Sequence, residues 1–227
     1  MLRNTWSRLV GVAVATLTTL WIGVGSARAF EPVDQSRSVN GFVIVPQCGQ
    51  QAFDDEEAVG FEPFDARAVA TVACPVASAK AAAGQRSQIS QVALLARGRA
   101  SSNAAASQTN VIHAIASSNY SVTFQVETQT QYTLRGRISA GASDDNVFVL
   151  AGATVRLVDT MGQELADYEV EPGAGGAEQT VIIDQGGILE PGEHTFTTQA
   201  STVIDNQVPP NGTAQARFEI LLRTPAP

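Results

Sequence analysis

The strongest constraint on the fold of this sequence is a strict alternation of apolar and polar side chains that starts at Tyr120. Tyr120, Val122, Phe124 and Val126 alternate with serine, threonine and glutamine residues. Because successive side chains of a β-strand point to opposite faces, this pattern predicts a strand with one buried face. Similar alternation returns in four later segments, residues 132–139, 153–157, 194–200 and 216–222. The second half of the chain therefore predicts antiparallel β-structure.

Turn-forming residues separate these predicted strands. The polar residues 128–131 predict a short turn that joins the strands on either side into a hairpin or a step of a meander. Residues 190–193 (EPGE) predict a type II turn, because proline fixes φ at the second position and glycine accepts a positive φ at the third. Many short strands with one apolar face indicate a sandwich or a barrel. Small inward residues favour two sheets about 10 Å apart, so we expect an all-β fold, a single antiparallel β-sandwich of jelly-roll or immunoglobulin-like type.

The first half of the chain has a weaker pattern. Residues 41–45, 88–100 and 111–115 predict strands, and Val92, Leu94 and Ala96 are expected to face inward in the second of these. Residues 76–84 are rich in alanine, the best helix former, and are compatible with one or two helical turns.

Cys48 and Cys74 are the only cysteines. In an exported protein an even pair predicts a disulfide, and closing a loop of this length stabilises a fold by about 3–4 kcal/mol in the chain-entropy model. A metal site would need further ligands, and the histidines lie far away in sequence; no C-x-x-C motif is present for redox chemistry. We expect the acidic segment between the two cysteines to be an N-terminal loop that the disulfide closes.

Residues 1–29 have the three parts of a secretory signal peptide. Arg3 and Arg8 precede an apolar run over residues 9–24. Ala27-Arg28-Ala29 follows this run and supplies small residues at the cleavage site. The competing interpretation is a membrane anchor, but a spanning helix needs about 20 apolar residues and this run is shorter. The sequence therefore predicts cleavage after Ala29, a single sandwich domain over residues 30–227, and a secreted or periplasmic protein.

Removal of the leader makes the chain more acidic. The full sequence has 14 basic and 22 acidic residues; three arginines leave with the leader, so the mature chain has 11 basic residues and a net charge of −11. A surface of that charge repels phosphate backbones and anionic lipid headgroups. We therefore expect neither nucleic acid nor, after cleavage, a membrane as a partner.

Several segments resemble exported bacterial β-sandwich proteins, many of which carry a C-terminal sorting tail of the PEP-CTERM type. The matching segments are residues 114–120 (AIASSNY), 121–126 (SVTFQV), 132–140 (YTLRGRISA), 153–157 (ATVRL) and 187–196 (GILEPGEHTF). The resemblance covers about half of the chain and implies an exported sandwich. The Pro-Glu-Pro motif, the apolar helix and the basic end of such a tail are missing, which implies a released rather than a sorted protein.

Acidic segments are the only candidates for a cofactor, and the cofactor would be calcium. Residues 54–57 (DDEE), with Glu62 and Asp65 nearby, offer the carboxylate oxygens that calcium prefers. Their spacing matches no EF-hand, and a charge run of this kind more often faces solvent. Asp144-Asp145-Asn146 is a weaker candidate, because aspartate and asparagine are also ordinary turn formers.

No catalytic or metal-ligating residues are predicted. His113 and His194 are too isolated for a metal centre, and no G-x-S-x-G motif is present. Exposed serine, threonine and glutamine side chains between Tyr120 and Arg137 suggest a glycan-contacting surface. Such surfaces usually display aromatic side chains that stack on sugar rings, and both tryptophans of this sequence lie in the predicted leader. The leading hypothesis is an exported non-catalytic structural or interaction protein with an unknown protein or glycan partner. A calcium- or glycan-binding sandwich module is the alternative, and a hydrolase the third hypothesis.

Overall fold

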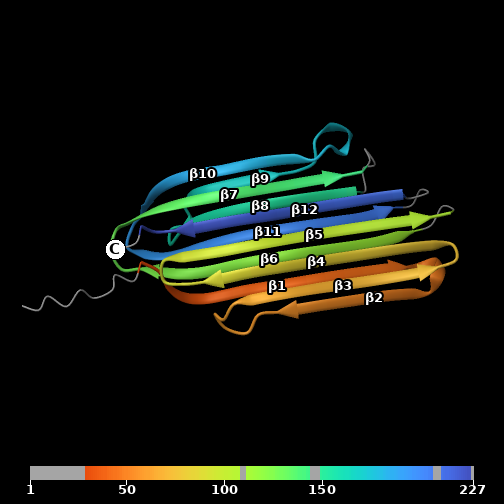
Figure 1. The fold of residues 1–227 in the computed structure, drawn as a ribbon, viewed down its shortest axis with the longest axis horizontal. Coiled ribbons are helices and arrows are strands. Elements are labelled where there is room, and N and C mark those ends of the chain that lie inside the picture. The colour runs from red at the N-terminus through yellow and green to blue at the C-terminus, as the bar shows by residue number, and fades with distance from the viewer. Residues whose placement is uncertain (1–28, 108–110, 144–148, 207–210, 226–227) are drawn as a thin grey trace, which may run out of the picture.

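The computed structural model describes residues 29–107, 111–143, 149–206 and 211–225. These residues form two antiparallel sheets of six strands that pack face to face (Figure 1). The strand order is β2–β1–β6–β11–β8–β9 in sheet A and β10–β7–β12–β5–β4–β3 in sheet B. In Figure 1 the two sheets overlie each other, with β2 and β3 along one edge and β9 and β10 along the other. The predicted all-β sandwich is confirmed.

Each sheet combines consecutive strands with strands that are distant in sequence. Sheet A contains β1 (Glu31–Val45), β2 (Gln50–Glu57), β6 (Ile112–Val126), β8 (Val149–Asp159), β9 (Glu164–Val170) and β11 (Gly192–Asn206). Sheet B contains β3 (Phe64–Cys74), β4 (Ala77–Ile89), β5 (Ala93–Ala106), β7 (Thr130–Ala142), β10 (Gln179–Leu189) and β12 (Asn211–Arg223). Two short 3-10 helices, η1 (Pro46–Cys48) and η2 (Ala174–Gly176), follow β1 and precede β10.

Most consecutive strands belong to different sheets. Strand β6 pairs with β1 and β11 in sheet A, whereas β7 pairs with β10 and β12 in sheet B. The predicted hairpin around residues 128–131 is therefore wrong, because the chain crosses there from one sheet to the other. Alternation shows which face of a strand is buried but not which strand lies beside it. Repeated crossing between two sheets is typical of Greek-key and jelly-roll sandwiches.

The core lies between the sheets and is uneven in thickness. Tyr120, Val122, Phe124 and Val126 are all buried, as their alternation predicted. Toward β3 and β4 the inward residues are mostly alanines, and the sheets approach closely: a side chain at Gly41 would place its Cβ 3.0 Å from the carbonyl oxygen of Ala81. Toward β7 and β8 the inward residues include larger side chains as well as alanine, such as Leu134, Ile138 and Leu157.

The disulfide is confirmed, but the loop that it was expected to close is not. Cys48, at the end of η1, is bonded to Cys74, at the end of β3, and ties sheet A to sheet B. Strands β2 and β3 occupy most of the intervening segment, and only residues 58–63 connect them. The sequence of residues 50–57 and 64–74 shows no clear apolar alternation. The inward positions of β3 are mostly alanine, and those of β2 include a charged residue, Asp54, so neither strand shows a row of large apolar side chains.

The predicted helical turns in residues 76–84 are also wrong, since this segment lies in β4. Ala79, Ala81 and Ala83 are buried and alternate with exposed or half-buried residues. Their small volume fits the narrow gap between the sheets, and this packing outweighs the helix propensity of alanine. The strand predicted over residues 88–100 is two strands, β4 and β5, with Val92 exposed in the turn between them.

A buried arginine holds the connection between β2 and β3. Arg37 on β1 is only 2% exposed, and its Nη2 donates hydrogen bonds to the carbonyl oxygens of Gly60 (2.6 Å) and Glu62 (2.8 Å). Its guanidinium carbon lies 5.7 Å from the ring centre of Phe64. Burial lowers the pKa of Arg37 from its ordinary value. The aliphatic part of the side chain fills the core while its charged end satisfies loop carbonyls.

The described residues begin at Ala29, so the predicted signal peptide lies almost entirely outside them. Phe30, the first residue of the expected mature chain, is fully buried and packs edge-on against Phe124, with ring centres 4.6 Å apart. Within the described part of the chain no helix has the length and hydrophobicity needed to span a membrane.

Candidate functional site

The outer face of sheet B carries nine of the eleven lysine and arginine side chains in the described residues. We call this surface the arginine face; its basic residues are Arg67, Lys80, Arg86, Arg97, Arg99, Arg135, Arg137, Arg217 and Arg223. Four acidic side chains lie among them: Asp65, Glu178, Asp184 and Glu219. Nine positive against four negative charges leave a surplus of five on one face of a chain whose net charge is −8.

The strand register arranges these residues in rows that run across the sheet. Asp65, Arg86, Arg97, Glu219 and Arg137 lie opposite one another on five neighbouring strands, and we call them the paired row. Glu219 accepts from Arg97 at 2.8 Å and from Arg137 at 3.4 Å, while Arg86 and Asp65 are 3.9 Å apart. Three arginines and two acids make this row nearly balanced in charge. Exposed pairs of this kind contribute only about 0–1 kcal/mol each to stability.

The neighbouring row is not balanced, and we call it the open row. It consists of Arg67, Gly84, Arg99, Arg217 and Ser139. Arg217 donates from its Nε to the Oγ of Ser139 at 2.8 Å and forms an ion pair with Glu178. Arg67 and Arg99 make no side-chain hydrogen bond or ion pair with any residue that the structure describes. Arg99 also lies directly opposite Arg217, and like charges in this position are destabilising.

Two hollows flank the open row. One, of about 370 Å³, lies between the open row and the paired row, and the other, of about 430 Å³, lies on the side of Lys80. Arg67, Arg99 and Arg217 line both. Short residues such as Gly84 form the floor, so the long arginine side chains stand around it. A guanidinium presents a fork of donors that matches carboxylate, sulfate and phosphate oxygens, and the open row can therefore bind oxyanions.

The outer face of sheet A has the opposite character. Arg156 is the one arginine or lysine that projects from it in the described residues, and it is paired with Glu164. Hydroxyl and amide side chains bond to one another across the strands, for example Asn40 to Ser117 at 2.8 Å. One row is apolar along five strands: Phe53, Phe42, Ile115, Val203 and Leu150. Phe53 and Leu150 in this apolar row are 65% and 59% exposed.

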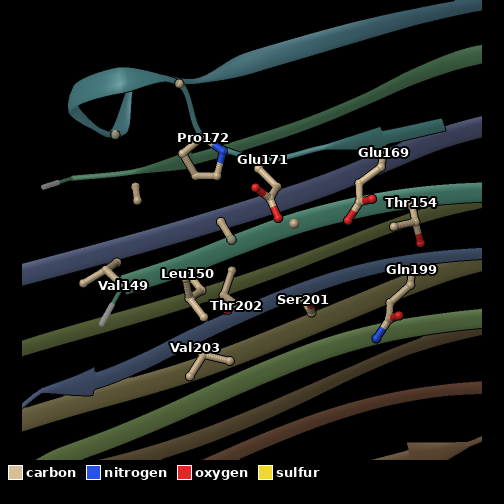
Figure 2. A pocket seen from close by; sticks show the side chains of 15 residues that line it. Val149, Leu150, Thr154, Glu169, Glu171, Pro172, Gln199, Ser201, Thr202 and Val203 are labelled. Carbon is tan, nitrogen blue, oxygen red and sulfur yellow. The ribbon is translucent and has the colours of Figure 1, made fainter. Parts of the chain in front are cut away.

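A third hollow, of about 500 Å³, lies at the edge of sheet A where β8, β9 and β11 meet the segment that follows β9 (Figure 2). Figure 2 shows Val149, Leu150 and Val203 at one end and Glu169 and Gln199 toward the other. Its lining contains no lysine or arginine. The hollow combines an apolar end with carboxylate and amide groups, a pattern that suits an uncharged polar ligand better than an anion.

The predicted calcium ligands do not converge. Residues 54–57 lie in β2, where alternation sends Asp54 and Glu56 to one face and Asp55 and Glu57 to the other. The Oδ2 of Asp54 accepts a hydrogen bond from the backbone N–H of Val69 at 2.6 Å. Throughout the described residues no three histidine, cysteine or acidic side chains gather around a metal-sized space. The weaker candidate, Asp144-Asp145-Asn146, lies outside the described residues.

The two histidines lie far apart. His113 is on the outer face of sheet A with its Nδ1 3.0 Å from the Oδ1 of Asp205. His194 is buried, contacts the carbonyl oxygen of Glu190 at 2.9 Å and stacks on Phe124. Since His113 and Phe124 stand at opposite ends of β6, the two imidazoles cannot serve one reaction. Neither lines any of the three hollows.

The predicted glycan-contacting surface between residues 120 and 137 is divided between the two outer faces. Ser121 and Thr123 project from sheet A, whereas Thr133 and Arg135 project from sheet B. The net charge of the sequence does not reveal the arginine face. Arginines two residues apart, at 97 and 99 and again at 135 and 137, were a local signal that basic side chains share a face. That their strands are separated only by β12 was not visible in the sequence.

No protein-family model matches the sequence, and no curated protein matches it. Three solved structures show how distant its structural neighbours are. The enzymatically active domain of bacteriophage CBA120 tailspike protein 4 is similar over 64% of this chain and 19% of its own, with 11% identity and a TM-score of 0.26. The arabinose-bound MgGH51 α-L-arabinofuranosidase is similar over 63% and 25%, with 12% identity and a TM-score of 0.24. The structure of infectious bursal disease virus, Gx strain, is similar over 86% and 58%, with 9% identity and a TM-score of 0.27.

The chain thus spans about a fifth and a quarter of the first two proteins. At these TM-scores the likenesses carry no argument about function.

Proposed function

We propose that this chain is a non-catalytic interaction protein that is exported and binds an anionic partner through the arginine face. The observation that carries the proposal is the open row, in which Arg67 and Arg99 have no side-chain partner among the described residues and Arg99 stands opposite the like-charged Arg217. Two like charges that face each other destabilise a sheet, and no described acidic residue pairs with Arg99 to offset this; such a cost is typical of functional surfaces.

The net charge of the chain does not prevent such binding. At physiological ionic strength charges are screened over about 8 Å. Two packed sheets lie about 10 Å apart, so the acidic side chains on the outer face of sheet A are further than this from a ligand on sheet B. An anion close to the arginine face therefore responds mainly to the positive surplus beneath it.

Export is supported by two independent features. The leader pattern of residues 1–29 is that of a signal peptide, and the Cys48–Cys74 disulfide is a bond that persists in oxidising compartments such as the periplasm and the cell exterior.

The test of the proposed function is binding to a generic polyanion. We expect the protein to bind dextran sulfate in a titration at low salt, and the logarithm of the affinity to fall linearly with the logarithm of salt concentration. Replacing the three open-row arginines (R67Q, R99Q, R217Q) should weaken binding at least tenfold. The matched control is R156Q on the opposite face, which should leave affinity unchanged. Absence of binding, or equal loss in both variants, would contradict the proposal.

A second candidate function belongs to the hollow in Figure 2, which has the features of a site for a neutral glycan. The observation in its favour is that the side chains of Glu169 and Glu171 form no hydrogen bond or ion pair with any described residue and line the same hollow as the apolar Val149, Leu150 and Val203. Carboxylates that accept from sugar hydroxyls beside an apolar surface fit such a ligand. Glu169→Gln with Glu171→Gln should then weaken binding of a neutral oligosaccharide and leave dextran sulfate binding unaffected.

A further inference from the structure

The spacing of the arginines indicates what kind of polyanion fits the arginine face. Neighbouring strands of a sheet are about 4.8 Å apart. Arg67 and Arg99 are two strands apart in the open row, and Arg97 and Arg137 are two strands apart in the paired row. The side chains of Arg67 and Arg99 therefore start about 10 Å apart across the strands, and those of Arg97 and Arg137 have the same separation. Arg217 is only one strand from Arg99, and Arg86 only one strand from Arg97, but Arg217 already pairs with Glu178 and Arg86 lies near Asp65.

The separation between Arg67 and Arg99 is wide compared with the charge spacing of duplex DNA. Each DNA strand carries one phosphate per about 3.4 Å of helix axis. A polysaccharide with an acidic group on every second sugar carries one charge per disaccharide, and two linked sugar rings span a distance similar to the separation between Arg67 and Arg99. We infer that the partner is an anionic polysaccharide of this kind, which lies across the strands of sheet B along the open row. This inference rests on the proposed function.

The open row supplies distinct contacts for the acidic groups and for the sugar rings. Arg67 and Arg99, whose guanidinium groups pair with no side chain in the described ranges, can each present a fork of donors to one acidic group. The side chain of Arg217 is held in place by Ser139 and Glu178. It therefore loses little conformational entropy when it contacts the bound polysaccharide. The hollow of about 370 Å³ beside these arginines leaves room for a sugar ring. The Arg99 side chain lies close to Gly84 in this hollow, since a Cβ at Gly84 would be 3.5 Å from Nε of Arg99.

Polar side chains on the Lys80 side complete the site. Ser101, Asn103 and Gln215 line the second hollow and are exposed, so their hydroxyl and amide groups can bond to sugar hydroxyls. The two hollows lie on either side of one row, which gives a single chain room for rings on both sides of the arginines.

Two other polyanions fit this surface less well. Single-stranded nucleic acids bind with bases stacked on aromatic side chains, and none of the outward positions on the described strands of sheet B is aromatic. A bilayer surface is flat and cannot enter the two hollows, so it would reach only the ends of the arginines.

The test compares four probes by fluorescence anisotropy or sedimentation at one ionic strength. The probes are a hyaluronan decasaccharide, with a carboxylate on alternate sugars, a κ-carrageenan decasaccharide, with a sulfate ester on alternate sugars, a single-stranded oligonucleotide of the same length, and vesicles that contain phosphatidylserine. We expect the two polysaccharides to bind at least tenfold more tightly than the oligonucleotide, with no vesicle binding. A repeat at pH 3 separates the two acidic groups, because carboxylates become protonated and sulfate esters do not.

The variants localise the site. R67Q and R99Q should each weaken polysaccharide binding about fivefold or more, and G84V should weaken it by filling the floor between the forks. The matched control is R223Q, which removes a charge from the same face but lies outside both hollows. Thermal melting of each variant checks that it is folded.

The outcomes separate this inference from the proposed function. If the oligonucleotide or the vesicles bind as tightly as the polysaccharides, or if R223Q weakens binding as much as R99Q, the polysaccharide inference is overturned and anion binding stands. If none of the probes binds, both proposals are overturned.

Discussion

The two outer faces of this sandwich are built from the same kind of alternating strand, yet they differ in almost every chemical property. On sheet A the polar side chains satisfy one another: Asn40 bonds to Ser117, and Thr123 to Thr195 at 3.1 Å. On sheet B the open row leaves Arg67 and Arg99 without partners in the described structure. The comparison teaches that net charge says little about a surface, because the strand register decides which charges become neighbours.

The largest expected effect concerns the bond that joins the two faces. The Cys48–Cys74 disulfide links sheet A to sheet B across a sequence separation of 26 residues. The double variant C48S/C74S should lower the free energy of unfolding by about 3–4 kcal/mol, because the unfolded chain regains loop entropy. Urea denaturation measures this, and a reducing agent should bring the wild type to the same midpoint while leaving the variant unchanged. An unchanged midpoint in the variant would show that the sheets do not depend on this link.

The next effect contrasts the inner and outer sides of sheet B. Gly98 faces the core, and a Cβ there would lie 2.2 Å from Cζ of Phe218 and 2.4 Å from Oγ of Ser118. Gly98→Ala should therefore lower the free energy of unfolding by about 1–3 kcal/mol through overpacking. Gly84→Ala on the outer side is the matched control, since its Cβ meets only ordinary contacts. Equal destabilisation by both variants in urea denaturation would contradict this difference between the two sides.

The next, smaller effect is a gain in stability rather than a loss. Arg99→Gln removes one of two like charges that stand directly opposite each other, so it should raise the free energy of unfolding by about 0.2–1 kcal/mol at low salt. The gain should shrink in 1 M salt, where the Debye length is about 3 Å. Arg156→Gln on sheet A removes a charge that has an acidic partner and should give no gain. A stability loss in Arg99→Gln would mean that the arginine is held by contacts rather than strained by repulsion.

The smallest effect appears on acidification. Hydrogen bonds from Arg217 and from the Ser139 hydroxyl lower the pKa of Glu178. A carboxyl whose pKa is lowered by folding stabilises the protein above its ordinary pKa of about 4.3, and this contribution is lost as the pH falls through the lowered value. Thermal melting from pH 7 down to pH 2 should therefore show a slightly steeper loss of Tm in the wild type than in Glu178→Gln. Identical slopes would show that this exposed pair adds nothing to stability.

The sequence predicted the fold class well where large apolar residues alternate with polar ones. Tyr120 to Val126 and Phe218 to Leu222 are buried on the predicted face. The sequence pattern did not predict the strands in which alanine takes the inward positions, as in β4. Alanine is only slightly more apolar than its neighbours along such a strand, and by itself it favours helix. The disulfide was predictable from two cysteines alone, but the strands between them were not.

The candidate site was not predictable, although every residue in it was visible. The sequence by itself determined which residues of each strand face outward, because side-chain alternation is a local property of the backbone. Only the tertiary structure decided that β3, β4, β5, β12 and β7 are neighbours, and this placed Arg67, Arg99 and Arg217 in one row. Strand order depends on long-range packing between segments distant in sequence, and no local pattern of side chains carries that information.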